Sequence, residues 1–268
     1  MTGEGTFRIL AAHSTEFVRE AASVAGAGPE ATELYGRFLT GCALMQLAQA
    51  PFDRVQCSIR QTGSLGELLA DVWPGPTVRG RLEFPSATQA PMVTAGGMFH
   101  CTRRPARGGE LYESVVPISS GGVGDALQQL LLESDQVLTF FSLVVVLDPA
   151  GQVARAGGLL VQAMPDATRE HLEAITSCLE KANFADLVTA GDPPLAAAEA
   201  LFHSLSLHHV GGDPLLYRCR CSKQAAVAAV SLLSDTELDE IRAGQEQRVT
   251  CEFCGQTQTV TALDLGAA

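Results

Sequence analysis

Four cysteines near the C-terminus are the residues of this chain whose types and spacing point most directly to chemistry. They form two close pairs, Cys219-Arg220-Cys221 and Cys251-Glu252-Phe253-Cys254. Zinc prefers soft ligands in a tetrahedron, and structural zinc sites commonly use four cysteine thiolates. A Cys-x-x-Cys pair followed by glycine, here Gly255, is typical of a tight knuckle that presents two sulfurs to one metal. The sequence therefore predicts one tetrahedral zinc ion held by Cys219, Cys221, Cys251 and Cys254.

The predicted zinc site has two interpretations, because thiolates are also the oxidisable form of cysteine. It is either a purely structural module or a redox switch, and the spacing alone does not choose between them. A small C-terminal domain buries too little surface to be robust alone, and structural zinc contributes about 10–16 kcal/mol to such modules. We therefore expect loss of the ion to unfold the tail, which favours the switch.

Ligand-free interpretations of the four cysteines fit less well. A thioredoxin-type site needs a single Cys-x-x-Cys motif in a βαβ context, and permanent disulfides do not suit a reducing cytosol. Two competing functions remain beside the switch: a thiol–disulfide oxidoreductase, and an interaction module with a static structural zinc ribbon.

The composition favours a globular protein of the cytoplasm. Of 268 residues, 18 are basic and 30 acidic, so the net charge is −12, and 46% are hydrophobic. Such an acidic chain is a poor candidate for binding nucleic acid, which needs clustered Lys and Arg, or an anionic membrane surface. Residues 1–6 lack the basic and apolar regions of a signal peptide. The longest apolar run, 140–147, is too short to span a bilayer.

The hydrophobic patterns predict an α+β fold in three parts. A mixed α/β core domain is expected over 1–165, a helical linker over 166–213 and a small zinc-binding domain over 214–268. Within the core, a helix is expected over 29–48, strands over 55–60, 78–84, 138–147 and 153–164, and turns over 63–66, 74–76 and 148–151.

The linker and the tail each have their own expected elements. In the linker, a helix after Thr168 carries Leu172, Ile175 and Leu179 on one face, and a helix after Pro193-Pro194 carries Leu195, Ala198, Phe202 and Leu205. In the tail, helices are expected over 223–233 and from a capping box at Ser234 to near Gly244, with short strands on both sides of Cys251–Cys254.

The remaining candidates for chemistry have ordinary structural interpretations. Cys42, Cys57 and Cys101 are expected to be small buried hydrophobes, and Cys178 a structural residue of the linker. His208-His209 is not needed for a site that four sulfurs complete. The segment 119–125 lacks the Gly-Lys-Ser/Thr of a phosphate-binding loop. No convincing catalytic set is present, so we do not expect an enzyme.

At its cysteine motifs the sequence resembles the redox-regulated holdase chaperones known as the heat shock protein 33 family. The resemblance is carried by 217–222 and 249–255, with the intervening helix at 233–241. It extends upstream to the Gly-Gly…Gln-x-x-Pro segment at 157–165, to Ser134-Asp135-Gln136-Val137, to Val78-Arg79-Gly80 and to the helix after Pro29. The chain departs from the family pattern at 110–116, which lacks the glycines usual around Tyr112, at Leu130–Leu132 and at Lys223-Gln224.

The resemblance implies a mechanism. The reduced, zinc-bound protein is inactive, and peroxide at raised temperature or hypochlorite forms the disulfides Cys219–Cys221 and Cys251–Cys254, with release of zinc and unfolding of the tail. The linker then loosens, and apolar surface binds unfolding client proteins without ATP. Family members can dimerise when active, so we expect a monomer–dimer equilibrium in which the homodimer belongs to the activated form.

Overall fold

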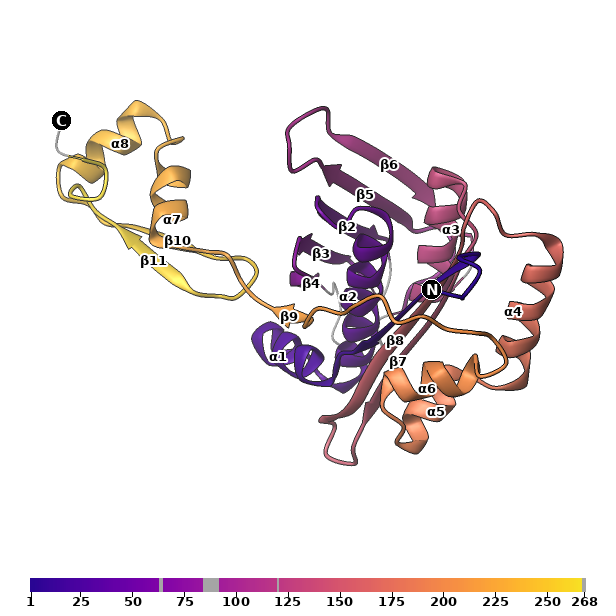
Figure 1. Ribbon diagram of the computed structural model, residues 1–268. Coiled ribbons are helices and arrows are strands. Elements are labelled where there is room, and N and C mark those ends of the chain that lie inside the picture. Colours follow the sequence, from indigo (N-terminus) through magenta and orange to yellow (C-terminus); the bar gives the residue numbers. More distant parts are fainter. Residues whose placement is uncertain (63–64, 84–91, 120, 267–268) are drawn as a thin grey trace. The chain divides into compact units, whose positions relative to one another are not determined.

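The computed structural model describes residues 1–62, 65–83, 92–119 and 121–266 (Figure 1). The chain folds as two compact units, Met1–Tyr217 and Arg218–Ala268, and its mixture of helices and sheets confirms the predicted α+β class. The segment 166–213 folds within the first unit, and the division of the chain into core, linker and switch domain stays a prediction. No helix of the described ranges is both long and apolar enough to cross a membrane.

A six-stranded sheet lies in the first unit, in the order β6-β5-β2-β3-β4-β9. Neighbouring strands are antiparallel except β4 and β9, which are parallel. The predicted strands at 55–60 and 78–84 are confirmed, although Phe84 lies outside the described residues. Gly63-Ser64, part of a predicted turn, also lies outside them. The strands are β2 (Arg54–Arg60), β3 (Glu67–Trp73), β4 (Thr77–Glu83), β5 (Met98–Arg104), β6 (Tyr112–Pro117) and β9 (Leu216–Tyr217).

A three-stranded antiparallel sheet has the order β1-β8-β7. Strands β7 (Thr139–Leu147) and β8 (Val153–Ala163) confirm the two predicted strands, whereas β1 (Phe7–His13) was not predicted. Helix α2 (Pro29–Gln49) packs on one face of this sheet and also contacts β3 and β4 of the other sheet. Because α2 is enclosed on several sides, it forms the centre of the main core, and helices α1 (Thr15–Ala25) and α3 (Val123–Asp135) pack against it.

Two helices, α5 and α6, pack on the other face of the three-stranded sheet, and α4 packs against α6 (Figure 1); we call these three helices the helical layer. A capping box of Thr168 with His171 begins α4, as the sequence predicts for Thr168. Leu195 was wrongly assigned to the apolar face of α6, since 54% of it is exposed while Leu201 is buried in its place. Helix α5 was not predicted, because seven residues are too few to show a helical period. The layer consists of α4 (Arg169–Lys181), α5 (Phe184–Ala190) and α6 (Pro194–Leu201).

The second unit is a small α+β module. Helices α7 (Lys223–Val230) and α8 (Asp235–Arg242) accompany a hairpin of β10 (Gln247–Thr250) and β11 (Thr257–Val260). The predicted capping box at Ser234 is present, while the predicted helix over 223–233 ends earlier, at Val230. Four hydrophobic residues form its buried core, namely Ala226, Val230, Ile241 and Val260.

Close helix–strand packing in the first unit depends on Gly158 of β8. A Cβ atom at this position would lie 2.8 Å from both Leu44 Cδ1 and Thr40 Cγ2 of α2. Contacts of this length are repulsive, so only glycine lets α2 approach the sheet this closely. This is a physical reason for part of the Gly-Gly segment that carries the family resemblance.

A ladder of ion pairs crosses β2, β3 and β4 of the six-stranded sheet. Asp71 is fully buried and accepts hydrogen bonds from Arg54 and Arg79 on the neighbouring strands. Glu67 pairs in the same way with Arg60 and Arg81. Burial alone would raise the pKa of Glu67, but the two arginines outweigh it and hold the pKa below its ordinary value. Cross-strand pairs of opposite charge fix the register of the three strands.

Replacing Gly158 with alanine is expected to destabilise the first unit by about 1–3 kcal/mol through overpacking against α2. The free energy of unfolding can be measured in guanidinium chloride by the fluorescence of Trp73, the single tryptophan of the chain. Gly212→Ala is the matched control, because nothing lies within 4 Å of its Cβ position. Equal stability of the two variants would contradict the packing argument.

The Glu67 ion pairs are expected to contribute to the pH dependence of stability. Because the folded pKa of Glu67 lies below its ordinary value of 4.5, the contribution is complete above pH 4.5 and is lost as the pH falls through the folded pKa. Glu67→Gln should therefore lose less stability than the wild type between about pH 5 and pH 3. Glu83→Gln, which removes a more exposed partner of Arg81, should follow the wild-type curve more closely.

Candidate metal centre

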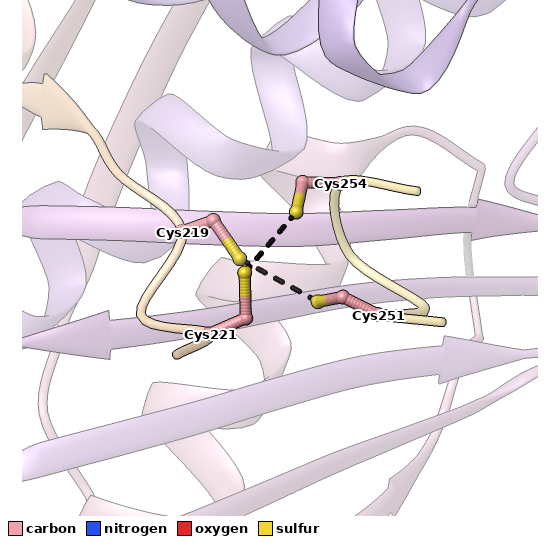
Figure 2. Close-up of side chains that lie close together, drawn as sticks. All are labelled: Cys219, Cys221, Cys251 and Cys254. Carbon is pink, nitrogen blue, oxygen red and sulfur yellow. Dashed lines mark hydrogen bonds between the residues drawn. The ribbon is translucent and has the colours of Figure 1, made fainter. Parts of the chain in front are cut away.

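The four cysteines singled out by sequence lie together in the second unit (Figure 2), and we call them the cysteine cluster. Two of them come from the turn between β10 and β11. There the backbone N–H of Cys251 donates to the carbonyl of Gln256, and the N–H of Gly255 donates to the carbonyl of Cys251, both at 2.8 Å. Gly255 has φ +69°, a conformation that favours glycine. This turn is the knuckle that the sequence predicts.

The other two sulfurs come from the segment between β9 and α7. Ser222 ends this segment by capping α7, where its Oγ accepts a hydrogen bond of 3.1 Å from the N–H of Ala225. Helix α7 thus begins at Lys223, two residues after Cys221, and its cap fixes the direction of the chain at this point. Cys219 and Cys221 point towards the knuckle from the opposite side (Figure 2).

The sulfur–sulfur distances suit a tetrahedral metal site. All four Sγ atoms lie within 4.8 Å of one another, with 3.6 Å between Cys219 and Cys251 and 3.4 Å between Cys221 and Cys254. Zinc–sulfur bonds of about 2.3 Å in a tetrahedron place the sulfurs about 3.8 Å apart. The cluster could therefore hold one metal ion with only small side-chain adjustments.

The charges of the cluster show why a cation would stabilise it. Burial raises the pKa of Cys219, but the backbone N–H of Cys221 and the neighbouring thiols outweigh it and lower the pKa to about 7. Burial and the neighbouring thiols raise the pKa of Cys221 to about 12 and raise that of Cys254 as well. The cluster thus accepts one negative charge readily and resists further ones. Four thiolates at this spacing require positive charge between them, which a divalent metal supplies.

Gln256 and the backbone amides around the sulfurs were not identified from the sequence. The Gln256 Oε1 lies 3.6 Å from the Sγ of Cys221, and its backbone also interacts with Cys254. Such outer-shell groups orient metal ligands and tune their basicity. The only signal in the sequence is the position of Gln256 directly after the knuckle glycine.

The other candidates lie outside the cluster. Cys42, Cys57, Cys101 and Cys178 are buried, as expected for small hydrophobic residues. Among the residues that the structure describes, no second group of three or more His, Cys, Asp or Glu side chains is arranged to hold a metal, and His208-His209 joins no such group. Of the segment 119–125, Ser120 lies outside the described residues, and α3 begins at Val123.

Comparisons with known proteins point to one family. The sequence profile of the family described as "Hsp33 protein" matches residues 1–261. The 33 kDa chaperonin of Syntrophotalea carbinolica is 31% identical over 281 residues, covering 99% of this chain and 96% of the relative. A 33 kDa chaperonin of Thermus thermophilus is also 31% identical, covering 96% of this chain and 81% of the relative.

The fold has a counterpart among solved structures. A crystal structure of the 33 kDa chaperonin (heat shock protein 33 homolog) of Thermotoga maritima superposes with a TM-score of 0.81 at 23% identity, covering 98% of this chain and 93% of the other. At this identity the likeness shows the fold alone. The profile match and the two relatives above 30% identity show more: this chain belongs to the Hsp33 family of chaperones.

Proposed function

We propose that this chain is a redox-regulated, ATP-independent holdase chaperone. In the reduced state the cysteine cluster holds one Zn²⁺ in a tetrahedral site and the protein is inactive. Oxidation of the cluster unfolds the C-terminal unit and loosens the helical layer, and the apolar surface released then binds unfolding client proteins and prevents their aggregation. The observation that carries the proposal is the convergence of four sulfurs in a unit with a very small core.

The small core supports metal-dependent folding of the C-terminal unit. Its four buried hydrophobic residues remove little apolar surface from water, so the hydrophobic contribution to its stability is small. Structural zinc contributes about 10–16 kcal/mol in comparable modules, which is as large as the whole stability of an ordinary domain, about 5–15 kcal/mol. Oxidation that removes the thiolates therefore removes the main support of this unit.

The oxidation chemistry balances for each cysteine pair. In our proposal Cys219 bonds to Cys221 and Cys251 bonds to Cys254. Each new S–S bond takes two thiolates and gives two electrons to peroxide, which takes up two protons and leaves as two molecules of water. A thiolate reacts faster than a thiol, and the lowered pKa of Cys219 makes its sulfur the first to attack peroxide if the metal is absent.

The helical layer supports the proposed exposure of apolar surface. It buries Ile175, Phe184, Leu201 and Phe202 against one face of the three-stranded sheet. The sheet contributes Phe7, Val144, Leu159 and Val161 to this cluster. Because α2 holds the opposite face, the layer can loosen while the sheet keeps its shape. Two complementary apolar surfaces would then face the solvent and become available to clients.

Other parts of the proposal concern partners and location. The partners are unfolding client proteins, and a second copy of the chain in the activated state. The net charge of −12 argues against nucleic acid and anionic membranes as partners. A reducing compartment such as the cytoplasm would keep the cluster reduced until oxidative stress. No catalytic turnover is part of this function.

Oxidation of the zinc-loaded protein tests the switch directly. Treatment with peroxide at raised temperature, or with hypochlorite, should release about one zinc ion per chain and suppress the aggregation of a thermally unfolding client protein. Zinc release can be followed with a chromogenic chelator and aggregation by light scattering, and a thiol reductant plus zinc should reverse both effects.

Three outcomes would contradict the proposed function. Retention of zinc after complete peroxide treatment would favour the static zinc ribbon. Release of zinc without suppression of aggregation would separate the metal site from chaperone activity. Catalytic reduction of a substrate disulfide by the reduced protein would favour the thiol–disulfide oxidoreductase.

Cys251→Ser is expected to weaken zinc binding and loosen the C-terminal unit without disturbing the first unit. Loss of an outer-shell partner weakens metal binding by about 10–100-fold, and loss of a thiolate ligand should cost more than that. Chelator competition measures the affinity, proteolysis after Arg218 reports loosening, and Trp73 fluorescence in β3 reports the core. Cys178→Ser is the matched control, since Cys178 lies in the helical layer, and it should bind zinc normally.

A further inference from the structure

Two buried cysteines of the first unit face each other across neighbouring strands. Cys57 of β2 and Cys101 of β5 are directly paired in the antiparallel register, and their sulfurs lie 4.0 Å apart. Directly opposed residues have Cα atoms about 4.5–5.5 Å apart, within the roughly 4.4–6.8 Å that a disulfide bond allows. The backbone at this place is therefore already suited to an S–S bond, and only side-chain rotation is needed.

The surroundings keep these two thiols unreactive while the core is closed. Cys57 and Cys101 are 0% and 1% exposed. The hydrogen bond with Cys101 lowers the pKa of Cys57, but Cys42 of α2 and burial outweigh it and hold the pKa well above the usual range. The hydrogen bond with Cys57, together with burial, raises the pKa of Cys101. Neutral thiols are poor nucleophiles, so the pair is protected as long as oxidant cannot enter.

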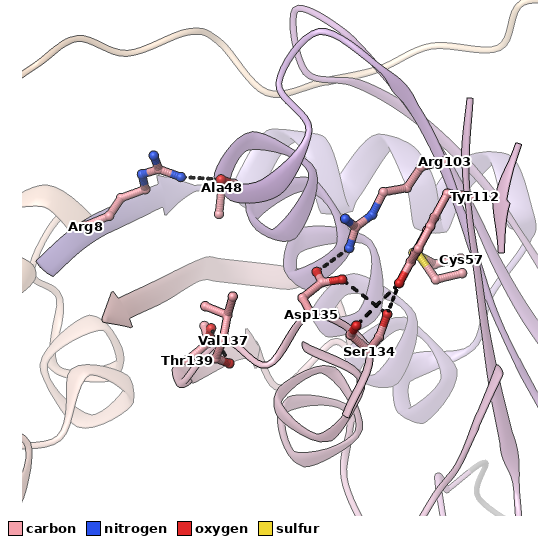
Figure 3. Close-up of polar contacts among 10 residues, drawn as sticks. Arg8, Ala48, Cys57, Arg103, Tyr112, Ser134, Asp135, Val137 and Thr139 are labelled. Atoms are coloured by element: carbon pink, nitrogen blue, oxygen red, sulfur yellow. Dashed lines mark hydrogen bonds and ion pairs between the residues drawn. The ribbon is translucent and has the colours of Figure 1, made fainter. Parts of the chain in front are cut away.

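A polar clamp closes the core beside this pair (Figure 3). Arg103, two residues after Cys101 on β5, interacts with its sulfur and forms an ion pair with Asp135 at the end of α3. The guanidinium also lies over the ring of Tyr112 on β6, whose OH is 2.7 Å from Ser134 Oγ. Tyr112 is 42% exposed, and β6 is an edge strand. These contacts tie β5 and β6 to α3 and adjoin the sulfur of Cys101.

We propose that Cys57 and Cys101 form a second redox site, which becomes a cross-strand disulfide when the clamp between β5 and α3 opens and admits peroxide. The thiol of one cysteine is first oxidised to a sulfenic acid with release of one water. The second thiol displaces the hydroxyl of this sulfenic acid, forming the S–S bond and releasing a second water. Once Cys101 is exposed to water, Arg103 stabilises its thiolate. The product links β2 to β5 covalently.

The product would hold two neighbouring strands of the six-stranded sheet together under oxidising conditions. Strands β5 and β2 are the second and third in the order β6-β5-β2-β3-β4-β9, so a covalent link between them opposes separation of β6 and β5 from the rest of the sheet. This site is independent of the cysteine cluster and of the proposed zinc switch. It reacts later than the cluster, because its thiols must first be uncovered.

A time course of peroxide oxidation on the full-length, zinc-loaded protein tests the site. Samples are quenched with an alkylating reagent and their disulfides mapped by peptide mass spectrometry. We expect the cysteine cluster to be oxidised first and a Cys57–Cys101 disulfide to accumulate afterwards, in preference to pairs that involve Cys42. Cys57 and Cys101 that stay alkylatable long after the cluster is oxidised, or that pair with Cys42 instead, would overturn the proposal.

Paired variants test the route of access. Asp135→Asn removes the charge that holds Arg103 and should speed formation of the disulfide several-fold. Asp125→Asn changes an exposed carboxylate at the other end of α3 and should leave the rate unchanged. Equal rates in the two variants would overturn the clamp as the gate.

A stability measurement tests the consequence and separates this site from the zinc switch. The oxidised wild-type core should unfold at a higher guanidinium concentration than the reduced one, and Cys57→Ser should abolish this shift while Cys178→Ser keeps it. Cys57→Ser should still release zinc on oxidation at the wild-type rate. A lower unfolding midpoint in the oxidised protein would overturn the role in securing the sheet, and the disulfide map of the wild type decides the pairing even if Cys57→Ser folds poorly.

Discussion

In our proposal, the C-terminal unit depends on how the charge of four sulfurs that lie within 4.8 Å of one another is compensated. Without a metal, the pKa of Cys219 is lowered to about 7, whereas burial, together with hydrogen bonds to neighbouring thiols, raises the pKa values of Cys221 and Cys254. A divalent cation would offset the repulsion among the thiolates, because each thiolate would then bond to the metal. The knuckle and the cap on α7 bring the sulfurs together, and in our proposal the cation keeps them there. In our proposal, the folding of this unit and the redox state of its sulfurs are therefore coupled through the metal.

In the first unit, the three-stranded sheet packs against α2 on one face and against the helical layer on the other. Successive residues of β8 point to opposite faces, so Leu160 packs in the main core with α2 while Leu159 and Val161 pack with the helical layer. Gly158 lets α2 lie close enough to hold its face without help from the layer. The layer itself consists of short helices whose stability comes from packing rather than from length. In the proposed mechanism, this asymmetry lets the layer loosen while α2 stays packed on the sheet.

The sequence allowed long elements and local motifs to be predicted, and failed where tertiary contacts decide. The pattern of α2 is long enough to be periodic, the capping boxes at Thr168 and Ser234 are local, and the cysteine spacing identifies the knuckle without any other information. Helix α5 is too short to show a helical period, and β1 can be recognised as a strand only from its pairing with β8. Leu195 fits a helical stripe but faces solvent, because Leu201 and Phe202 occupy the space beside the sheet.

The same limit applies to the sites. The ligand set of the cysteine cluster could be predicted because its members are close in sequence, whereas the role of Gln256 depends on how the hairpin folds back. The pairing of Cys57 with Cys101 depends on the register of β2 and β5. These strands are neighbours in the sheet, but β3 and β4 lie between them in the sequence, so no local pattern fixes their register. Each of these cysteines alone is well described as a small buried hydrophobe. Only their direct pairing across β2 and β5 suggests a redox role as well.

The two groups of cysteines differ in burial, and we therefore expect them to differ in how readily they are oxidised. The members of the cluster are partly exposed, and the pKa of one of them is lowered to about 7, so an oxidant can reach a thiolate without any change in the fold. The core pair is enclosed, so its oxidation requires a local opening, which in our proposal must break the Arg103–Asp135 and Tyr112–Ser134 contacts. In our two proposals, mild oxidation therefore acts on the C-terminal unit, which unfolds reversibly. Only stress strong enough to open the core would reach the Cys57–Cys101 pair, where a covalent link would oppose further unfolding.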